Sequence, residues 1–295
     1  MKTKSTFALK LFGSYLIHGA FFLSVFLFVF TALGAPVIKY AGRDYTILSM
    51  ITDRGLYEKC RMDPINNSFL AGYAFDASKW YATLLPVITA IPALFVYDKI
   101  DASLKTYVLS RISRRKYCLL QLMTAFLTGF SVVALGVALY YGIVSFLLPA
   151  YDMNSDILNA MASYYGYSGA ARFTTLAIKV SNSAIAGGLM AASSLVLYHL
   201  VHDKFLVITI PMMIMYISDK LYYLYDKQRF ANAENYDDIA PAVASALFPS
   251  NISRMFSMMG SEYGISYAWF LPVACILFLL IYMLYRLVFE KSVTL

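Results

Sequence analysis

Six long stretches of the chain carry almost no charged residues, and this feature restricts the fold more than any other. A helix that crosses a membrane needs about 20 mostly apolar residues. The stretches at about 11–35, 80–97, 117–148, 178–201, 205–225 and 265–287 reach or approach that length. The chain is 60% hydrophobic and 14% charged, whereas soluble domains average about 45–50% apolar and about 25% charged. We therefore expect an all-α membrane protein, with six spans in a single transmembrane domain over residues 1–295.

The charged residues are distributed unequally between the two sides of this predicted domain. Six spans place both termini on one side, together with residues 98–116 and the short turn at 199–204. The 45 residues of this side hold 12 of the 24 Lys and Arg but only 4 of the 17 Asp and Glu. The positive-inside rule makes it the cytoplasmic side. The net charge of +7 then reflects topology and contact with membrane lipid, and no nucleic-acid partner is expected.

The three segments predicted to lie outside are longer than plain turns. They comprise residues 36–79, 149–177 and 226–264. Segments of this length suggest a small folded cap over the outer ends of the spans. The apolar run at the N-terminus is too long for the apolar region of a signal peptide, which has about 7–15 residues. We therefore expect it to remain as the first span.

Sequence signatures of enzymes and cofactor sites are missing from the chain. It has no phosphate-binding loop of the form G-x-x-x-x-G-K-[ST], no H-E-x-x-H and no G-x-S-x-G. No catalytic, metal-binding or cofactor-binding residue is therefore expected. His199 and His202 are interpreted as cations at a helix C-terminus, and His18 as a partner in a hydrogen bond between helices. None of the six runs has a carboxylate near its centre, which disfavours an ion-coupled transporter.

The fourth predicted span has one face of small residues. Gly187, Gly188, Ala191 and Ala192 recur at helical spacing. Small side chains allow the backbone of another helix to approach closely. Two interpretations remain open, namely packing within the chain and a seam between two copies of it.

Residues 98–116 form the most informative segment of the predicted cytoplasmic side. Leu104, Val108 and Ile112 lie four residues apart, which predicts one apolar stripe on a short amphipathic helix. Half of the 12 basic residues on this side belong to the segment and lie off the stripe. The segment suits either a solvated basic loop or a helix that docks on a soluble partner.

This segment resembles the first cytoplasmic loop of the permease subunits of bacterial type-2 ABC exporters. Asp98 occupies the acidic position, Ala102-Ser103 stands where Gly-Thr is usual, and Ile112-Ser113-Arg114 matches an Ile-Ser-Arg motif followed by basic residues and an aromatic. Arg111 replaces the usual proline. The resemblance implies a coupling helix that fits a groove of an ATPase subunit, with the turn at 199–204 as a second contact. The candidate coupling residues are Asp98, Asp101, Lys105, Tyr107, Arg111, Arg114, Arg115, His202 and Lys204.

The same resemblance implies the rest of the architecture and the function. Short re-entrant helices are expected on the outer side before the last span, where residues 239–256 are apolar but contain Pro241 and Pro249. The expected protein is a permease in the bacterial plasma membrane, with both termini cytoplasmic. It would export an amphiphilic peptide, lipid or drug. Its expected partners are an ABC ATPase subunit, which would bind ATP and magnesium, and a second copy or a homologous permease.

Three other functions remain as alternatives at this point. An ion-coupled secondary transporter would carry buried carboxylates and internal repeats. A membrane sensor or scaffold would bind a ligand through the outer loops. A membrane enzyme would need a cluster of His, Cys or carboxylate residues.

Overall fold

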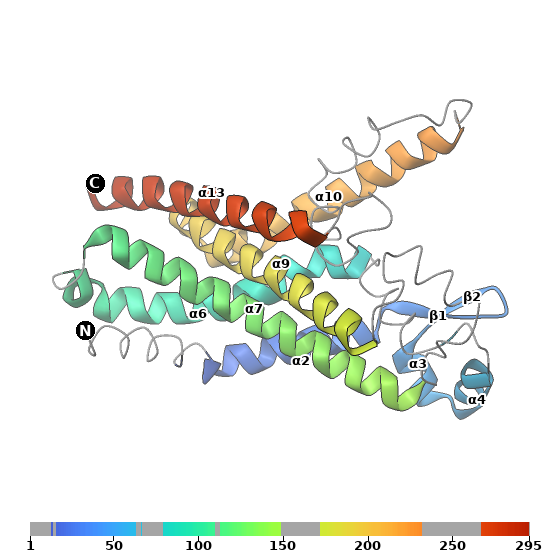
Figure 1. Ribbon diagram of the computed structural model, residues 1–295. Helices are drawn as coiled ribbons and strands as arrows, with labels where there is room; N and C mark the ends of the chain where they lie inside the picture. Colours follow the sequence, from blue (N-terminus) through green and yellow to red (C-terminus); the bar gives the residue numbers. More distant parts are fainter. Residues whose placement is uncertain are drawn as a thin grey trace.

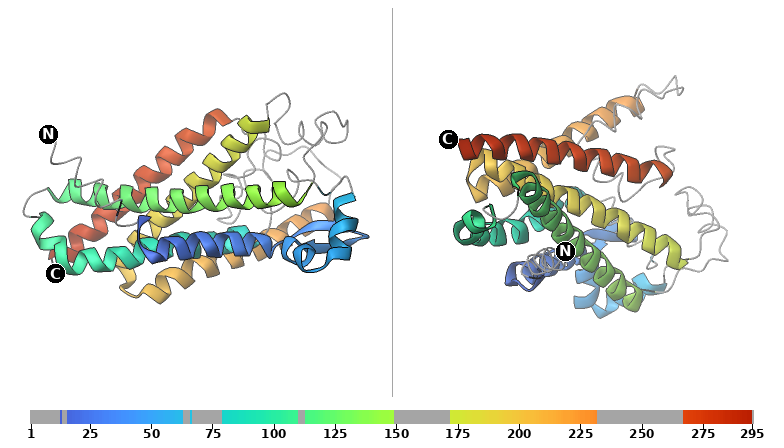
Figure 2. Two further views of the ribbon diagram at one scale, coloured as in Figure 1. Left: turned by 90° about the horizontal axis from the view of Figure 1, so that it is seen from below. Right: turned by 60° about the vertical axis from the view of Figure 1, so that its left-hand side comes forward.

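Six long helices form the body of the described structure. The computed structural model describes residues 13, 16–62, 66, 79–109, 113–148, 172–231 and 267–294. The six helices are α2 (Gly19–Leu33), α6 (Lys79–Leu109), α7 (Arg114–Leu147), α9 (Arg172–Val201), α10 (Lys204–Ala231) and α13 (Tyr267–Thr294). They run alternately in opposite directions (Figure 1). Consequently α2 begins and α13 ends at the end of the bundle where α6 turns into α7 and α9 into α10 (Figures 1 and 2).

Four of these helices are long and apolar enough to cross a membrane. Within the described residues, the qualifying segments are Arg114–Leu147, Val180–Val201, Lys204–Leu224 and Leu271–Phe289. The apolar parts of the other two helices, Gly19–Leu33 and Trp80–Phe95, are shorter. A mostly helical protein with helices apolar enough to cross a membrane was expected and is found. The count of six spans stays a prediction.

One continuous helix covers the second predicted span and the start of the amphipathic segment, where a boundary was expected. The helix α6 continues from Lys79 to Leu109, through Pro86 and Pro92, so that Asp98, Asp101 and Lys105 are part of it. Its last turns bend away from the rest of the helix (Figures 1 and 2). A change from apolar to charged residues marks where a helix leaves an apolar environment, but it does not interrupt the backbone hydrogen bonds.

Residues 36–46 correct the prediction of an entirely helical fold. Strands β1 (Pro36–Tyr40) and β2 (Arg43–Thr46) pair antiparallel. Between them Ala41 and Gly42 both have positive φ, 48° and 74°, which suits a two-residue turn whose twist matches that of the strands. The hairpin leads into α3 (Ile47–Thr52), whose first turn is closed by a capping box of Thr46 and Ser49.

The hairpin, α3 and α4 (Arg54–Met62) form a small cap at the other end of the bundle (Figure 1). The buried side chain of Asn66 ties the cap together. Its amide nitrogen donates to the carbonyl oxygens of Lys39 (2.8 Å) and Cys60 (3.3 Å), and its oxygen accepts from the Lys39 nitrogen (3.1 Å). The Tyr57 hydroxyl donates to the Leu147 carbonyl oxygen at 3.2 Å, which joins α4 to the end of α7. Residues 36–79 thus contain a folded element, as the length of the segment suggested.

The central contact of the bundle joins α7 to α9 through backbones that lie very close together. A Cβ atom added to Gly129 would lie 2.5 Å from the Gly187 carbonyl oxygen and 2.5 Å from the Ala191 Cβ. A Cβ added to Gly187 would meet the side chain of Val133 at 2.3 Å. Because no larger residue fits at these two positions, the small residues set the separation of the two helices.

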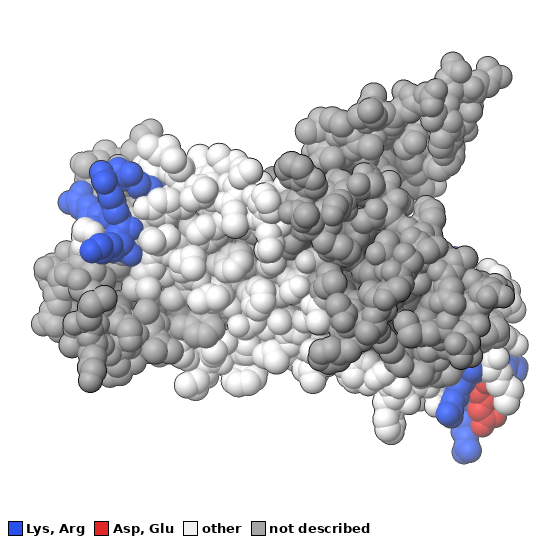
Figure 3. Space-filling model, viewed as in Figure 1, with Lys and Arg blue, Asp and Glu red and all other residues white. Residues whose placement is uncertain are grey.

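On the face shown in Figure 3, the charged side chains that the structure describes lie at the two ends of the bundle. In the view of Figure 3 the surface between the two ends is uncharged where the structure describes it. The exposed residues Arg114, Arg115 and Lys116 begin α7 at the end where α13 finishes. We call this the basic end. At the opposite end, α4 carries exposed Arg54, Glu58, Lys59 and Arg61. An uncharged belt between two charged ends is typical of a protein embedded in a bilayer.

Candidate functional site

The predicted coupling residues that the structure describes lie at the basic end. Asp98, Asp101, Lys105 and Tyr107 belong to the last turns of α6, Arg114 and Arg115 begin α7, and His202 and Lys204 belong to the turn from α9 to α10. Arg111 lies outside the described residues. The structure therefore brings residues from two separate segments to the same end of the molecule.

The turn from α9 to α10 is short and closed by its own residues. His202 has a positive φ of 58°, and its backbone nitrogen donates to the Tyr198 carbonyl oxygen at 2.8 Å, which ends α9 in the left-handed conformation common at helix C-termini. Asp203 then caps α10, because its Oδ1 accepts from the backbone nitrogens of Phe205 (2.7 Å) and Leu206 (3.1 Å). Only two residues separate the helices, so that α9 and α10 are held tightly at this end.

A network of buried polar side chains lies close to both segments. It joins four helices through Tyr97 of α6, Tyr117 and Gln121 of α7, His199 of α9 and Tyr285 of α13. The Tyr285 hydroxyl donates to Gln121 Oε1 at 2.7 Å, and Gln121 Nε2 donates to the Tyr117 hydroxyl at 2.8 Å. Nε2 of His199 lies 2.9 Å from the Tyr97 hydroxyl and 3.5 Å from the Tyr285 hydroxyl. We call these five residues the four-helix network.

Every member of the four-helix network is shielded from the surroundings. The most exposed of them is His199, at 8%, and Tyr97 and Tyr285 are at 0%. The His199 ring stacks on the rings of Tyr285 and Phe289, with centroids 5.2 and 5.6 Å away. Polar groups this deeply buried are costly unless they are hydrogen-bonded, and those partners are found on neighbouring helices.

The hydrogen-bond directions in the network follow from the groups present. A neutral imidazole has one nitrogen that donates and one that accepts. With its proton on Nε2, His199 donates to both the Tyr97 and the Tyr285 hydroxyl oxygens, because the Tyr285 hydroxyl hydrogen is used by Gln121. The resulting chain of bonds runs from α6 through α9, α13 and α7. It can hold these four helices in one arrangement, and its imidazole can also take up a proton.

The two histidines near the end of α9 have different surroundings, which the sequence spacing did not separate. His202 is exposed in the turn, whereas His199 faces inward and belongs to the four-helix network. His199 is therefore a buried, hydrogen-bonded residue in the last turn of α9, and its charge there stays a prediction. His18 also differs from expectation, because its Nδ1 accepts from the backbone nitrogen of Ala20 at 3.2 Å and so caps its own helix, α2.

The four small residues of α9 lie in the contact with α7. Gly187, Gly188, Ala191 and Ala192 are all buried in the single chain. A Cβ on Gly188 would meet the ring of Phe126 at 2.8 Å. A second copy of the chain could reach these four residues only by displacing α7.

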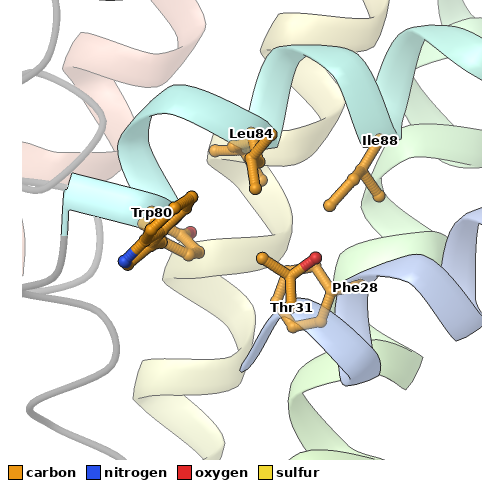
Figure 4. Close-up of a pocket in the computed structure, with 7 residues that line it drawn as sticks. Phe28, Thr31, Trp80, Leu84 and Ile88 are labelled. Carbon is orange, nitrogen blue, oxygen red and sulfur yellow. The ribbon is translucent and has the colours of Figure 1, made fainter. Parts of the chain in front are cut away.

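A small apolar crevice lies between α2 and α6, near the cap. Its lining includes Phe28, Thr31, Trp80, Leu84 and Ile88 (Figure 4). The Thr31 hydroxyl donates to the Leu27 carbonyl oxygen of its own helix. The crevice therefore presents mainly carbon atoms, and the four-helix network is the stronger candidate for a functional site.

None of the five network residues was among the candidate site residues expected from the sequence. Tyr97 and Tyr117 immediately flank residues 98–116, and Gln121 is an uncharged polar residue one helical turn after Tyr117. That spacing could have drawn attention to them. The partnership of Gln121 with Tyr285, which lies 164 residues further along the chain, leaves no local signal.

Comparisons of the chain with family models, with curated proteins and with solved structures gave no match. Among the residues that the structure describes, no group of three or more His, Cys, Asp or Glu side chains could hold a metal ion.

Proposed function

We propose that the chain is the membrane-embedded permease subunit of an ATP-driven exporter, with ATP and magnesium bound by a separate ATPase subunit. One observation carries the proposal. The two segments that the sequence suggests for docking, 98–116 and 199–204, begin or end in helices that meet at one basic end of the bundle. An ATPase bound there would contact both segments at once.

The arrangement of the helices supports a transport role in the membrane. Four helices are long and apolar enough to cross it. We propose that α2 and α6 are the other two spans, since both pack along α7, one of those four helices. Six spans place both chain ends on the same side as the basic end, and the positive-inside rule makes that side cytoplasmic, in a bacterial plasma membrane.

The proposed mechanism is mechanical, with the bond chemistry on the partner. ATP binding closes two ATPase subunits, and each pulls on the segment 98–116 of one permease. That movement rearranges the helices of two permease copies, or of one copy and a homologue, and opens a path outward. An amphiphilic cargo such as a peptide, lipid or drug suits the apolar faces of these helices. The outer cap would then contribute to the choice of cargo.

Co-purification tests this function directly. The chain is expressed with its own tag together with any ABC ATPase encoded beside it, extracted in mild detergent and purified through that tag. We expect an ATP-hydrolysing protein to be recovered in stoichiometric amount. A chain that purifies alone and moves a substrate across vesicle membranes without ATP would contradict the proposal.

His199 favours a second candidate, a proton-coupled transporter. An ionisable residue buried within a membrane helix is a common sign of a proton pathway, and His199 is 8% exposed and linked to three other helices through the network. Reconstituted vesicles distinguish the two functions. Transport driven by a pH gradient in the absence of ATP supports this candidate, and transport that requires ATP and an ATPase supports the first.

A further inference from the structure

We infer that the four-helix network is a mechanical link through which a movement of residues 98–116 is passed to α9 and α13. We call this link the joint. The inference extends the proposed function and rests on it in one respect, because the proposed ATPase is what moves the segment. Tyr97 and Tyr117 are the residues immediately before and after the segment. Both are anchored in the network, at 0% and 2% exposed. The segment is thus fixed at its two ends by buried side chains.

Each anchor leads to a different helix of the bundle. The Tyr97 hydroxyl contacts His199 of α9 at 2.9 Å. Tyr117 accepts from Gln121 at 2.8 Å, and Gln121 accepts from Tyr285 of α13 at 2.7 Å. A displacement of either end of the segment therefore has to move α9 or α13, or to break a buried hydrogen bond.

The ring packing around the network makes these links stiff. His199 lies against Tyr285 and Phe289 of α13, and Phe289 lies 5.8 Å from the ring of Tyr117. The rings of Tyr117, Tyr285 and Phe289 belong to one buried cluster at the basic end. Aromatic side chains have few rotatable bonds, so a shift in one ring is passed to its neighbours rather than absorbed.

The helices linked by the joint differ in how firmly the rest of the chain holds them. Half or more of the spanning segments of α7 and α9 is buried within the chain, 50% and 61%, whereas only 11% of that of α13 is buried. Over the described residues α13 is therefore less covered by protein than α7 and α9, although Ala274 and Phe278 also pack on the bundle. We infer that Tyr97, Tyr117, Gln121, His199 and Tyr285 are positioning residues, and that α13 is the helix they move most.

The test removes hydroxyl groups and keeps the rings. The double variant Tyr97→Phe with Tyr285→Phe deletes both hydroxyls that face His199 Nε2, while the aromatic packing remains. Tyr282→Phe is the matched control, because Tyr282 lies on α13 beside the same cluster but outside the network. Spin labels are placed in two pairs, Ser113→Cys with Met283→Cys and Ser113→Cys with Leu200→Cys, in a Cys275→Ser background. All three label positions are exposed.

Distances between the labels are measured in lipid nanodiscs by double electron–electron resonance. We expect the Ser113–Met283 distribution to broaden or shift in the double variant and to stay unchanged in Tyr282→Phe. A purely structural role would lower the melting temperature without altering the distribution below it. An unchanged distribution in the double variant would overturn the inference.

A second measurement connects the joint to transport. In a complex with its ATPase, the double variant should lose transport while ATP hydrolysis continues, and Tyr282→Phe should retain both. Normal transport by the double variant would also overturn the inference. Failure to recover any ATPase contradicts the proposed function instead, and the label distances then still decide whether the joint exists.

Discussion

The hydroxyl of Tyr285 donates a hydrogen bond to Gln121 Oε1 at 2.7 Å, which joins helices α13 and α7 inside the bundle. Gln121 is in turn bonded to Tyr117, the first residue after the segment 98–116. One amide side chain therefore serves two hydroxyl groups. Removing it leaves both hydroxyls to find other partners in a site without access to water.

This relationship predicts energetic coupling between Gln121 and Tyr285. Gln121→Leu should lower the free energy of unfolding by about 1–3 kcal/mol, because it removes two buried hydrogen bonds, those to Tyr285 and Tyr117. Tyr285→Phe should cost less, since one bond is lost and the ring stays. The double variant should be less destabilised than the sum of the two, by about 0.5–2 kcal/mol. Unfolding in mixed micelles measures the cycle. Strict additivity would show that the two side chains act independently.

The close contact of α7 with α9 predicts that one added methyl group lowers the stability of the fold. Gly129→Ala places a Cβ 2.5 Å from the Gly187 carbonyl oxygen, which is backbone and cannot rotate away. We expect the variant to be destabilised by about 1–3 kcal/mol. Gly142→Ala is the control, because nothing lies within 4 Å of its added Cβ, and it should be neutral or stabilising. Thermal unfolding in detergent compares them. Equal melting temperatures would contradict the close contact.

The hydrogen bonds of Asn66 predict that the cap protects Cys60 from alkylation. Cys60 is buried at 0%, and its carbonyl oxygen accepts from Asn66. Asn66→Ala should separate β1 from α4 and raise the alkylation rate of Cys60 by about tenfold, the equivalent of about 1.4 kcal/mol in local opening. Peptide mass spectrometry follows the modification of each cysteine. Thr52→Ala, which changes an exposed hydroxyl of the same cap, should leave the rate unchanged.

The proposed orientation of the bundle, with the basic end cytoplasmic, predicts which residues react from outside the cell. In a Cys275→Ser background, Met62→Cys in the cap should react with a membrane-impermeant maleimide on intact cells. Ser113→Cys at the basic end should react only after permeabilisation. Both native side chains are exposed, so access is decided by the membrane. The reverse pattern would invert the topology, and reaction of both on intact cells would contradict the assignment of opposite sides.

The proposed docking of an ATPase at the basic end predicts that basic residues there are required. Reversal of Arg111, Arg114 and Arg115 to glutamate should abolish transport-coupled ATP hydrolysis and leave the fold intact, because Arg114 and Arg115 are exposed. Reversal of Arg54 and Lys59 in the cap, also exposed, is the control and should leave hydrolysis coupled. Hydrolysis and gel-filtration profiles are measured together. Unchanged hydrolysis in an assembled complex would move the contact elsewhere.

The sequence allowed the long helices to be predicted closely and the short elements poorly. The run at 117–148 corresponds to α7, Arg114–Leu147, because an uncharged stretch of that length has few other stable conformations in a membrane. The hairpin at 36–46 was not predicted, since its strands are only five and four residues long and depend on pairing. The continuation of α6 past Asp98 was missed because a charged residue does not end a helix.

The candidate site could be predicted from the sequence even less completely than the fold. The position of Arg114, Arg115, His202 and Lys204 at one end followed from counting spans. The inward orientation of His199 did not, because it depends on Tyr97 and Tyr285, which are 102 and 86 residues away in the chain. A single sequence contains the residues of such a network but not their pairing.

The backbone contact between Gly129 and Gly187 has a consequence for how the molecule can change shape. No flexible side chain lies between α7 and α9 at this point, so the two helices cannot slide along each other without a steric clash. These two helices form the rigid central pair of the bundle. In any conformational cycle the other helices must then tilt about this pair. The distance between α7 and α9 should stay constant during the cycle, whereas the distances from these two helices to α10 and α13 should vary.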